Sequence, residues 1–310
     1  MASNFPYPGP TSLPPFGQAP DPLIAYGPAA APRWFDNDAE RLTAYLDLIQ
    51  DNGGSAIECV LLPGPVSIEQ RRVHVSDELW PHVVHEVRRR DMIVALHWPL
   101  LPEYHFAAAS NGPAAMANLA RAILVSAADL LQERIVLVVH GDSDDAERTR
   151  DQCLAILESE STCDRLEIAV ELRSRNNPED QRWDRSLESM VETLTDWREP
   201  RIALCLDIAN AWRNTGVVPN LDQRSLNLLR HVHLHDVRPD GNLHAPLSDS
   251  GIDWAPFLCD LRSSGWNGSV TLEIRYRYAS ENGEPWSVLA DNLRRIHDVL
   301  DMGVDATQCR

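Results

Sequence analysis

The stretch from residue 230 to residue 254 reads RHVHLHDVRPDGNLHAPLSDSGIDW, and it opens with the alternating pattern of a β-strand. Side chains point to opposite faces in turn along a strand, so His231, His233 and His235 share one face. Val232 and Leu234 share the other face, which can pack on a helix. A face of histidines suits a polar cavity or a metal, because neutral imidazole is a common metal ligand. The alternative is a hydrogen-bonded strand with His231 and His235 near solvent.

Five other apolar, β-branched runs also end in a residue that can bind a metal or a substrate. These runs are IVALHWP to His97, RIVLVVHGD to His140, LEIAVELR to Glu171, RIALCLDIAN to Asp207 and SVTLEIR to Glu273. Together with His233, these residues recur at intervals of roughly 26 to 43 residues, about the length of a strand, a helix and two short loops. The pattern predicts parallel α/β units with ligands at the carboxyl ends of the strands. In a (β/α)8 barrel that end carries the active site.

The chain divides into eight successive strand-then-helix units, which predicts a single (β/α)8 TIM barrel over residues 22–310. Strands are expected near residues 22–27, 55–62, 92–98, 134–140, 166–171, 201–207, 231–235 and 270–275. Helices are expected near residues 36–52, 76–90, 113–131, 145–158, 222–229, 253–263 and 286–300, and another should end near residue 197. Asp36 and Ser76 are the expected N-cap residues of the first two helices. The proline-rich residues 1–21 are expected to form an extended arm outside the barrel.

The predicted strands also indicate what lines the barrel. Within residues 201–207, Ala203, Cys205 and Asp207 share one face, and large apolar side chains that could pack on the helices share the other. Glu58 lies within the second predicted strand and could also face the interior. A polar interior requires a ligand, an ion or water to satisfy its hydrogen-bonding groups.

Composition restricts the classes of partner and the compartment. The formal net charge of -18 disfavours a nucleic-acid surface, because Lys and Arg supply most of the affinity for phosphates. The six cysteines include no CxxC pair, so we expect reduced thiols in a cytoplasmic protein. We expect neither a membrane span nor a secretory signal, because no apolar run is long enough and the amino terminus lacks a basic region.

Four of the strand-end residues would come from neighbouring strands: Glu171, Asp207, His233 and Glu273. Three carboxylates and one imidazole form a mostly oxygen-donor site that suits Mn²⁺, with Mg²⁺, Co²⁺ and Zn²⁺ as alternatives. Without a cation, the carboxylates would repel one another and the pKa of one of them would rise. The alternative to a metal site is that the carboxylates form ion pairs with arginines, of which the sequence offers Arg173, Arg175 and Arg275.

Taken in order, the strand-end motifs are LHWP, VVHGD, AVELR, CLDIAN, HVHLHD, HAPLSDSGIDW and TLEIR. In order and spacing they resemble the motifs of the xylose-isomerase-like TIM barrels, over residues 55–300. That superfamily holds sugar isomerases and epimerases, inosose dehydratase-like lyases and DNA repair enzymes of the endonuclease IV type. The resemblance implies one divalent metal ion, with Mn²⁺ expected, held by Glu171, Asp207, His233 and Glu273.

The resemblance also implies a metal-dependent isomerase, epimerase or related lyase that acts on a sugar-like polyhydroxy carbonyl compound. In the epimerase branch, Glu171 and Glu273 would act as acid and base on opposite faces of the substrate. The residues expected around the substrate are His97, His140, Trp98, Asn210, His235, His244 and Arg275. Trp98 and Trp212 could each stack on a sugar ring or be structural.

The endonuclease IV branch is the alternative, and it uses more metal ligands. Its first two histidines match His97 and His140, which could hold a second metal beside Glu171 or bind substrate hydroxyls. The chain departs from that branch at Asn210, where the branch has histidine, and at Asn242, where it has aspartate. We therefore expect neither a trinuclear zinc site nor a nucleic-acid partner.

Two further alternatives concern binding and assembly. A non-catalytic barrel used for binding should have lost the four metal ligands, and all four are present. The proline-rich arm could cover the barrel or a partner subunit, so the sequence also leaves a homo-oligomer open.

Overall fold

The barrel is closed and its strands follow chain order. The computed structural model describes residues 24–30, 38–60, 79–98, 135–158, 166–175, 177, 179–248 and 251–301. Its parallel strands are β1 Ala25–Ala30, β2 Ala56–Val60, β3 Ile93–His97, β4 Ile135–Val139, β5 Leu166–Glu171, β6 Ile202–Asp207, β7 Leu229–Leu234 and β8 Ser269–Leu272. Each pairs with its neighbours in sequence, and β8 pairs with β1 to close the sheet. The predicted (β/α)8 TIM barrel is confirmed.

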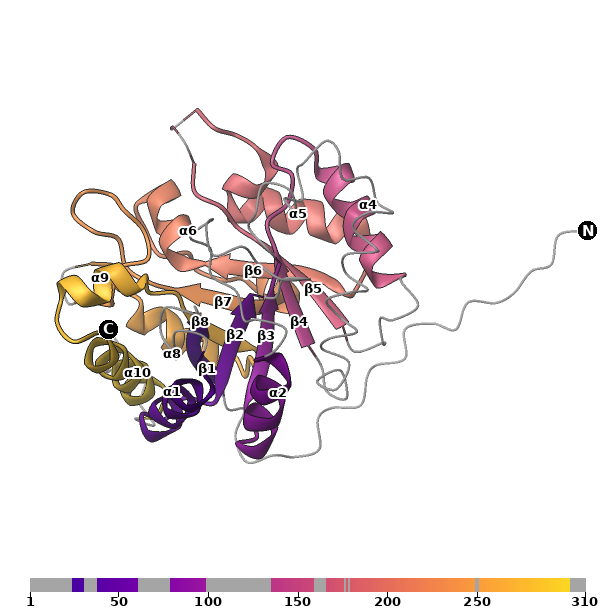
Figure 1. The fold of residues 1–310 in the computed structure, drawn as a ribbon. Helices are drawn as coiled ribbons and strands as arrows, with labels where there is room; N and C mark the ends of the chain where they lie inside the picture. Colours follow the sequence, from indigo (N-terminus) through magenta and orange to yellow (C-terminus); the bar gives the residue numbers. More distant parts are fainter. Residues whose placement is uncertain are drawn as a thin grey trace, which may run out of the picture.

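Helices surround the strands (Figure 1). They are α1 Ala39–Asp51, α2 Trp80–Arg89, α4 Ala146–Leu157, α5 Leu187–Trp197, α6 Ile208–Thr215, α7 Gln223–Leu228, α8 Ala255–Ser263, α9 Tyr276–Glu281 and α10 Pro285–Asp301, and the 3-10 helix η4 Trp183–Arg185 precedes α5. The short helices α6 and α9 were not expected. The predicted arm at residues 1–21 and the predicted helix at 113–131 lie outside the described residues. The prediction that Ser76 caps the second helix is wrong, because α2 begins at Trp80 with Leu79 as its N-cap.

The first helix begins later than the sequence predicted. The carboxylate of Asp38 accepts a hydrogen bond from the backbone N–H of Arg41 at 2.9 Å, so Asp38 is the N-cap of α1. The prediction that Asp36 caps this helix is therefore wrong, since an N-cap residue bonds the N–H three positions further on. The predicted helical period of Leu42, Tyr45, Leu46 and Ile49 is confirmed, because all four side chains are buried.

Small and large apolar side chains separate as predicted. Cys205 belongs to a small buried cluster with Val138 and Ala169, distinct from the main hydrophobic core. Leu204 and Leu206, on the opposite face of the same strand, belong to the main core together with residues of the surrounding helices. The two faces of β6 therefore pack in separate clusters.

One glycine allows β1 to lie close to β2. A Cβ atom built on Gly27 of β1 would lie 1.6 Å from the carbonyl oxygen of Ala56 in β2. Only a residue without a side chain allows this approach.

The structure tests two expectations, reduced cysteines and the lack of a membrane span. Cys59, Cys153 and Cys205 are buried free thiols, whereas Cys259 is disulfide-bonded, so the expectation of reduced thiols is wrong for Cys259. Within the described ranges, no helix is both long enough and apolar enough to cross a membrane.

Candidate metal centre

The four predicted metal ligands lie at or next to the carboxyl ends of neighbouring strands. Glu171 and Asp207 are the last residues of β5 and β6, His233 is the last residue but one of β7, and Glu273 directly follows β8. Ligand atoms of Glu171, Asp207 and His233 lie within 4.8 Å of one another. Glu273 joins His233 in a second group of ligand atoms defined by the same limit. The barrel therefore gathers these residues from strands far apart in the sequence.

His233 lies between the two glutamates. Its Nδ1 atom is 3.3 Å from a carboxylate oxygen of Glu273 and 3.6 Å from one of Glu171. The imidazole is completely buried, and Nδ1 has no hydrogen-bond partner within the described part of the chain. A buried polar atom without a partner costs free energy. A cation at this point would satisfy the nitrogen lone pair and both carboxylates, so the residues present fit a divalent metal ion.

Histidines keep both glutamates ionised. Burial alone would raise the pKa of Glu171, but His140 and His233 hold it well below its usual value. Burial acts in the same direction on Glu273, but His233 and His244 lower its pKa to about 2. Both side chains are therefore carboxylates at neutral pH, which is the form that binds cations and accepts protons.

Asp207 is held rigidly by its own helix. It is the N-cap of α6, and its two oxygens accept hydrogen bonds from the backbone N–H of Asn210 at 2.8 Å and from the side-chain amide at 2.7 Å. His235 Nε2 adds a contact of 3.2 Å to the same carboxylate. The unexpected helix α6 thus fixes one of the predicted metal ligands.

The loop after β7 brings His244 to the cluster. The buried carboxylate of Asp236 accepts hydrogen bonds from the backbone N–H groups of Ser248 and Ile252 at 3.1 and 3.0 Å, which closes this loop. His244 has a positive φ of 64°, a conformation that costs a non-glycine residue free energy and often occurs at functional sites. Its Nδ1 lies 3.5 Å from the carboxylate of Glu273.

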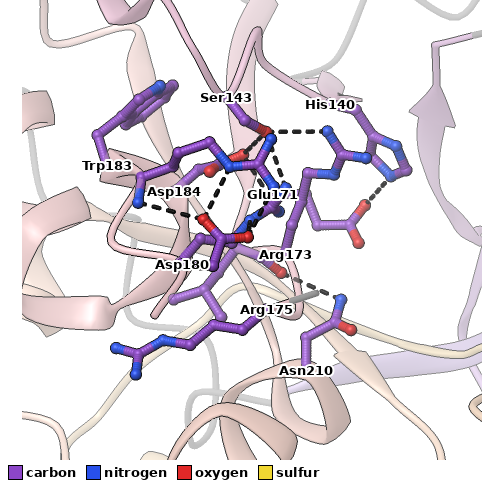
Figure 2. A network of polar contacts seen from close by, with 12 residues as sticks. His140, Ser143, Glu171, Arg173, Arg175, Asp180, Trp183, Asp184 and Asn210 are labelled. Atoms are coloured by element: carbon purple, nitrogen blue, oxygen red, sulfur yellow. Dashed lines mark hydrogen bonds and ion pairs between the residues drawn. The ribbon is translucent and has the colours of Figure 1, made fainter. Parts of the chain in front are cut away.

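The structure assembles most of the predicted substrate-binding residues around these ligands. His97 and His140 flank Glu171, with their Nε2 atoms 3.4 and 2.7 Å from its carboxylate, and Figure 2 shows His140 directed at Glu171. Asn210, His235 and His244 contact the ligands as described above. Two other side chains lie elsewhere: the hydrophobic core holds Trp98, and Arg275 is exposed with its guanidinium 6.0 Å from the ring of Tyr278.

Two residues of the cluster were not among the predicted site residues. Glu58 and His231 are both buried and contact each other at 2.7 Å. The alternative considered for this strand, with His231 and His235 near solvent, is wrong, because both side chains are completely buried. The signal in the sequence was a lone carboxylate in the apolar strand AIECV, facing the same side as the histidines once the barrel closes.

The arginines near Glu171 contact a neighbouring group of polar residues and not the metal ligands (Figure 2). Arg173 donates a hydrogen bond to Ser143 Oγ at 3.1 Å, and this hydroxyl donates to Asp184 at 2.7 Å. Arg185 contacts both Ser143 and Asp180. Among the ion pairs of the described residues, none joins an arginine to Glu171, Asp207 or Glu273, so pairing with arginine does not account for this carboxylate cluster.

Comparisons with known proteins agree with the fold. A family model described as "Xylose isomerase-like TIM barrel" matches residues 46–296. An L-ribulose 3-epimerase structure is similar at a TM-score of 0.65 and 14% identity, with 92% of this chain and 96% of that chain covered. Two further structures are a D-psicose 3-epimerase from Clostridium cellulolyticum with D-tagatose (TM-score 0.63, 13% identity, coverage 90% and 99%) and endonuclease IV from Thermus thermophilus (TM-score 0.60, 18% identity, coverage 90% and 100%). No match was found among curated protein sequences.

Proposed function

The chain belongs to the xylose isomerase-like TIM-barrel family, and on that premise we propose that it is a divalent-metal-dependent isomerase or epimerase, or a related lyase. Its substrate would be a sugar-like polyhydroxy carbonyl compound. One observation carries the proposal: the carboxylates of Glu171 and Glu273 both lie within 3.6 Å of the buried Nδ1 of His233, which has no hydrogen-bond partner among the described residues. Epimerases among the similar structures support the same class of reaction.

Glu171, Asp207, His233 and Glu273 would hold one metal ion. Three oxygen donors and one nitrogen donor favour Mn²⁺, and the same set accepts Mg²⁺, Co²⁺ or Zn²⁺. The bound cation would supply Lewis-acid polarisation of a carbonyl oxygen, which acidifies the neighbouring C–H group.

The proton transfer itself would fall to the glutamates. Glu171 ends β5 and Glu273 follows β8, and their carboxylates lie 3.6 and 3.3 Å from His233 Nδ1. One carboxylate would remove the proton beside the carbonyl group, and either the same carboxylate or its partner would return it. His140 would hold the carboxylate of Glu171 in place, and His244 would do the same for Glu273.

An endonuclease IV-like phosphodiesterase is the second candidate. The grouping of His97, His140 and Glu171 favours it, because their ligand atoms lie within 4.8 Å of one another and could hold a second metal. The net charge of -18 weighs against a DNA substrate.

Metal content and proton exchange together separate the two candidates. Elemental analysis of protein purified without chelator should give about one divalent ion per chain, whereas three zinc ions would favour the phosphodiesterase. Incubation with ketoses and Mn²⁺ in D₂O, followed by NMR, should place deuterium on the carbon next to the substrate carbonyl. Cleavage of DNA containing an abasic site, without any conversion of ketoses, would overturn the isomerase proposal.

A further inference from the structure

Glu58 lies in the middle of β2, away from the strand ends that carry the other acidic residues of the cluster. Its side chain is 1% exposed. A single carboxylate oxygen, Oε2, lies 2.7 Å from His231 Nε2 and 3.0 Å from His233 Nε2. Both histidines come from β7, which is far from β2 along the chain. One buried oxygen therefore binds two imidazoles.

This contact determines which nitrogen of His233 carries the proton. Oε2 of Glu58 lies within hydrogen-bond distance of two imidazole nitrogens, and a carboxylate oxygen accepts hydrogen bonds, so Nε2 of His233 donates. A neutral imidazole that is protonated on Nε2 has its lone pair on Nδ1. That nitrogen is the one that lies 3.3 Å from Glu273 and 3.6 Å from Glu171.

His231, one of the two imidazoles that contact Glu58, has a further partner. Its Nδ1 lies 2.7 Å from Ser269 Oγ in β8. Since His231 also donates through Nε2 to Glu58, its Nδ1 accepts from the serine hydroxyl. Side chains from β2, β7 and β8 thus form one buried chain of hydrogen bonds that ends at His233.

We propose that Glu58 is a positioning residue, which fixes the tautomer and the ring orientation of His233 so that Nδ1 faces the metal ion. The inference rests on the metal site proposed above and adds a residue that is not itself one of the four ligands. Carboxylates that accept from metal-binding histidines orient the ring and raise its basicity, and their loss typically weakens metal binding by about 10–100-fold.

The test measures metal binding and not turnover. Glu58→Leu fills the space without offering an acceptor, and Glu58→Gln restores an acceptor oxygen. The matched control is Glu86→Gln, which removes a buried carboxylate from α2, where its partners are Arg89 and Arg90. Calorimetric titration of chelator-treated protein with Mn²⁺ should give a dissociation constant raised about 10–100-fold in Glu58→Leu. It should give a smaller rise in Glu58→Gln and no change in the control, at an unchanged stoichiometry.

Spectroscopy and a milder variant separate positioning from a general loss of structure. The visible spectrum of the Co²⁺-loaded Glu58→Leu protein should shift towards that of His233→Ala, because the imidazole no longer binds in the same way. Ser269→Ala should weaken Mn²⁺ binding in the same direction, so the proposal stays testable even if Glu58→Leu does not fold.

Three results would overturn the inference. They are unchanged Mn²⁺ affinity in folded Glu58→Leu, unchanged affinity in both Glu58→Gln and Ser269→Ala, or a loss of one bound ion per chain, which would make Glu58 a ligand. If the unaltered protein binds no divalent ion, the proposed function falls as well. If it binds Mn²⁺ as described but converts no ketose, the role of Glu58 stands and only the reaction is wrong.

Discussion

Replacement of Glu273 by glutamine separates metal binding from proton transfer at the candidate site. Among the described residues, the Glu273 carboxylate contacts two imidazoles, His233 at 3.3 Å and His244 at 3.5 Å. In the same part of the chain Glu171 contacts three, His140 at 2.7 Å, His97 at 3.4 Å and His233 at 3.6 Å. Substitution of Glu273 therefore disturbs fewer neighbours and is the cleaner experiment. The amide keeps one oxygen that can bind a cation, but it cannot accept a proton at neutral pH.

Glu273→Gln should lower the catalytic rate strongly and change the structure of the site little. A general base contributes about 10²–10⁴-fold in rate, which corresponds to roughly 3–5 kcal/mol in the activation free energy. Three of the four proposed metal ligands are unchanged, so the Glu273→Gln protein should still bind Mn²⁺ at a raised metal concentration. We expect a metal-loaded protein with kcat lowered about 10²–10⁴-fold.

The assay is the initial rate of ketose conversion at saturating Mn²⁺, with metal content measured on the same sample and deuterium uptake from D₂O followed by NMR. Glu281→Gln is a suitable control, because this glutamate lies on α9 close in sequence to Glu273 but is half exposed and bound to Arg238. Recovery of most of the activity of Glu273→Gln at high Mn²⁺ would mean that Glu273 only holds the metal. Turnover of the unaltered protein without any deuterium uptake would refute both glutamates as acid and base.

Other perturbations test the surrounding structure. Asn210→Ala removes the side-chain donor to the carboxylate at the end of β6 and should weaken Mn²⁺ binding by about tenfold, measured by calorimetry. Gly27→Ala should lower the free energy of unfolding by about 1–3 kcal/mol in urea denaturation, because the added Cβ overlaps a neighbouring carbonyl oxygen. Hydrogen bonds from Arg89 and Arg90 lower the pKa of Glu86 to about 2. This carboxylate therefore stabilises the fold fully above pH ~4.5 and progressively less as the pH falls toward about 2, so Glu86→Gln should reduce the decline in melting temperature over that range. An identical decline in both proteins would show that the ion pairs do not contribute.

The order of the strands and helices, and the position of the metal ligands at the carboxyl ends of the strands, could be predicted from the sequence. Parallel strands joined by helices present their carboxyl ends on one side of a barrel, so residues such as Glu171 and Asp207 at the ends of apolar runs had to lie near one another. Alternation along β6 likewise indicated that Cys205 faces the interior. These predictions depend only on local periodicity and on the direction of the strands.

The tertiary structure alone determined how the side chains pair. Sequence spacing says which face of a strand a residue occupies, but the depth at which it meets another strand depends on the stagger of the closed barrel. That stagger brings Glu58, from the middle of β2, to His231 and His233 of β7, and it leaves His235 buried against Asp207 instead of near solvent. Glu58 and its partner His231 are more than a hundred positions apart in the sequence. No local pattern specifies such a contact, because it exists only when the last strand pairs with the first.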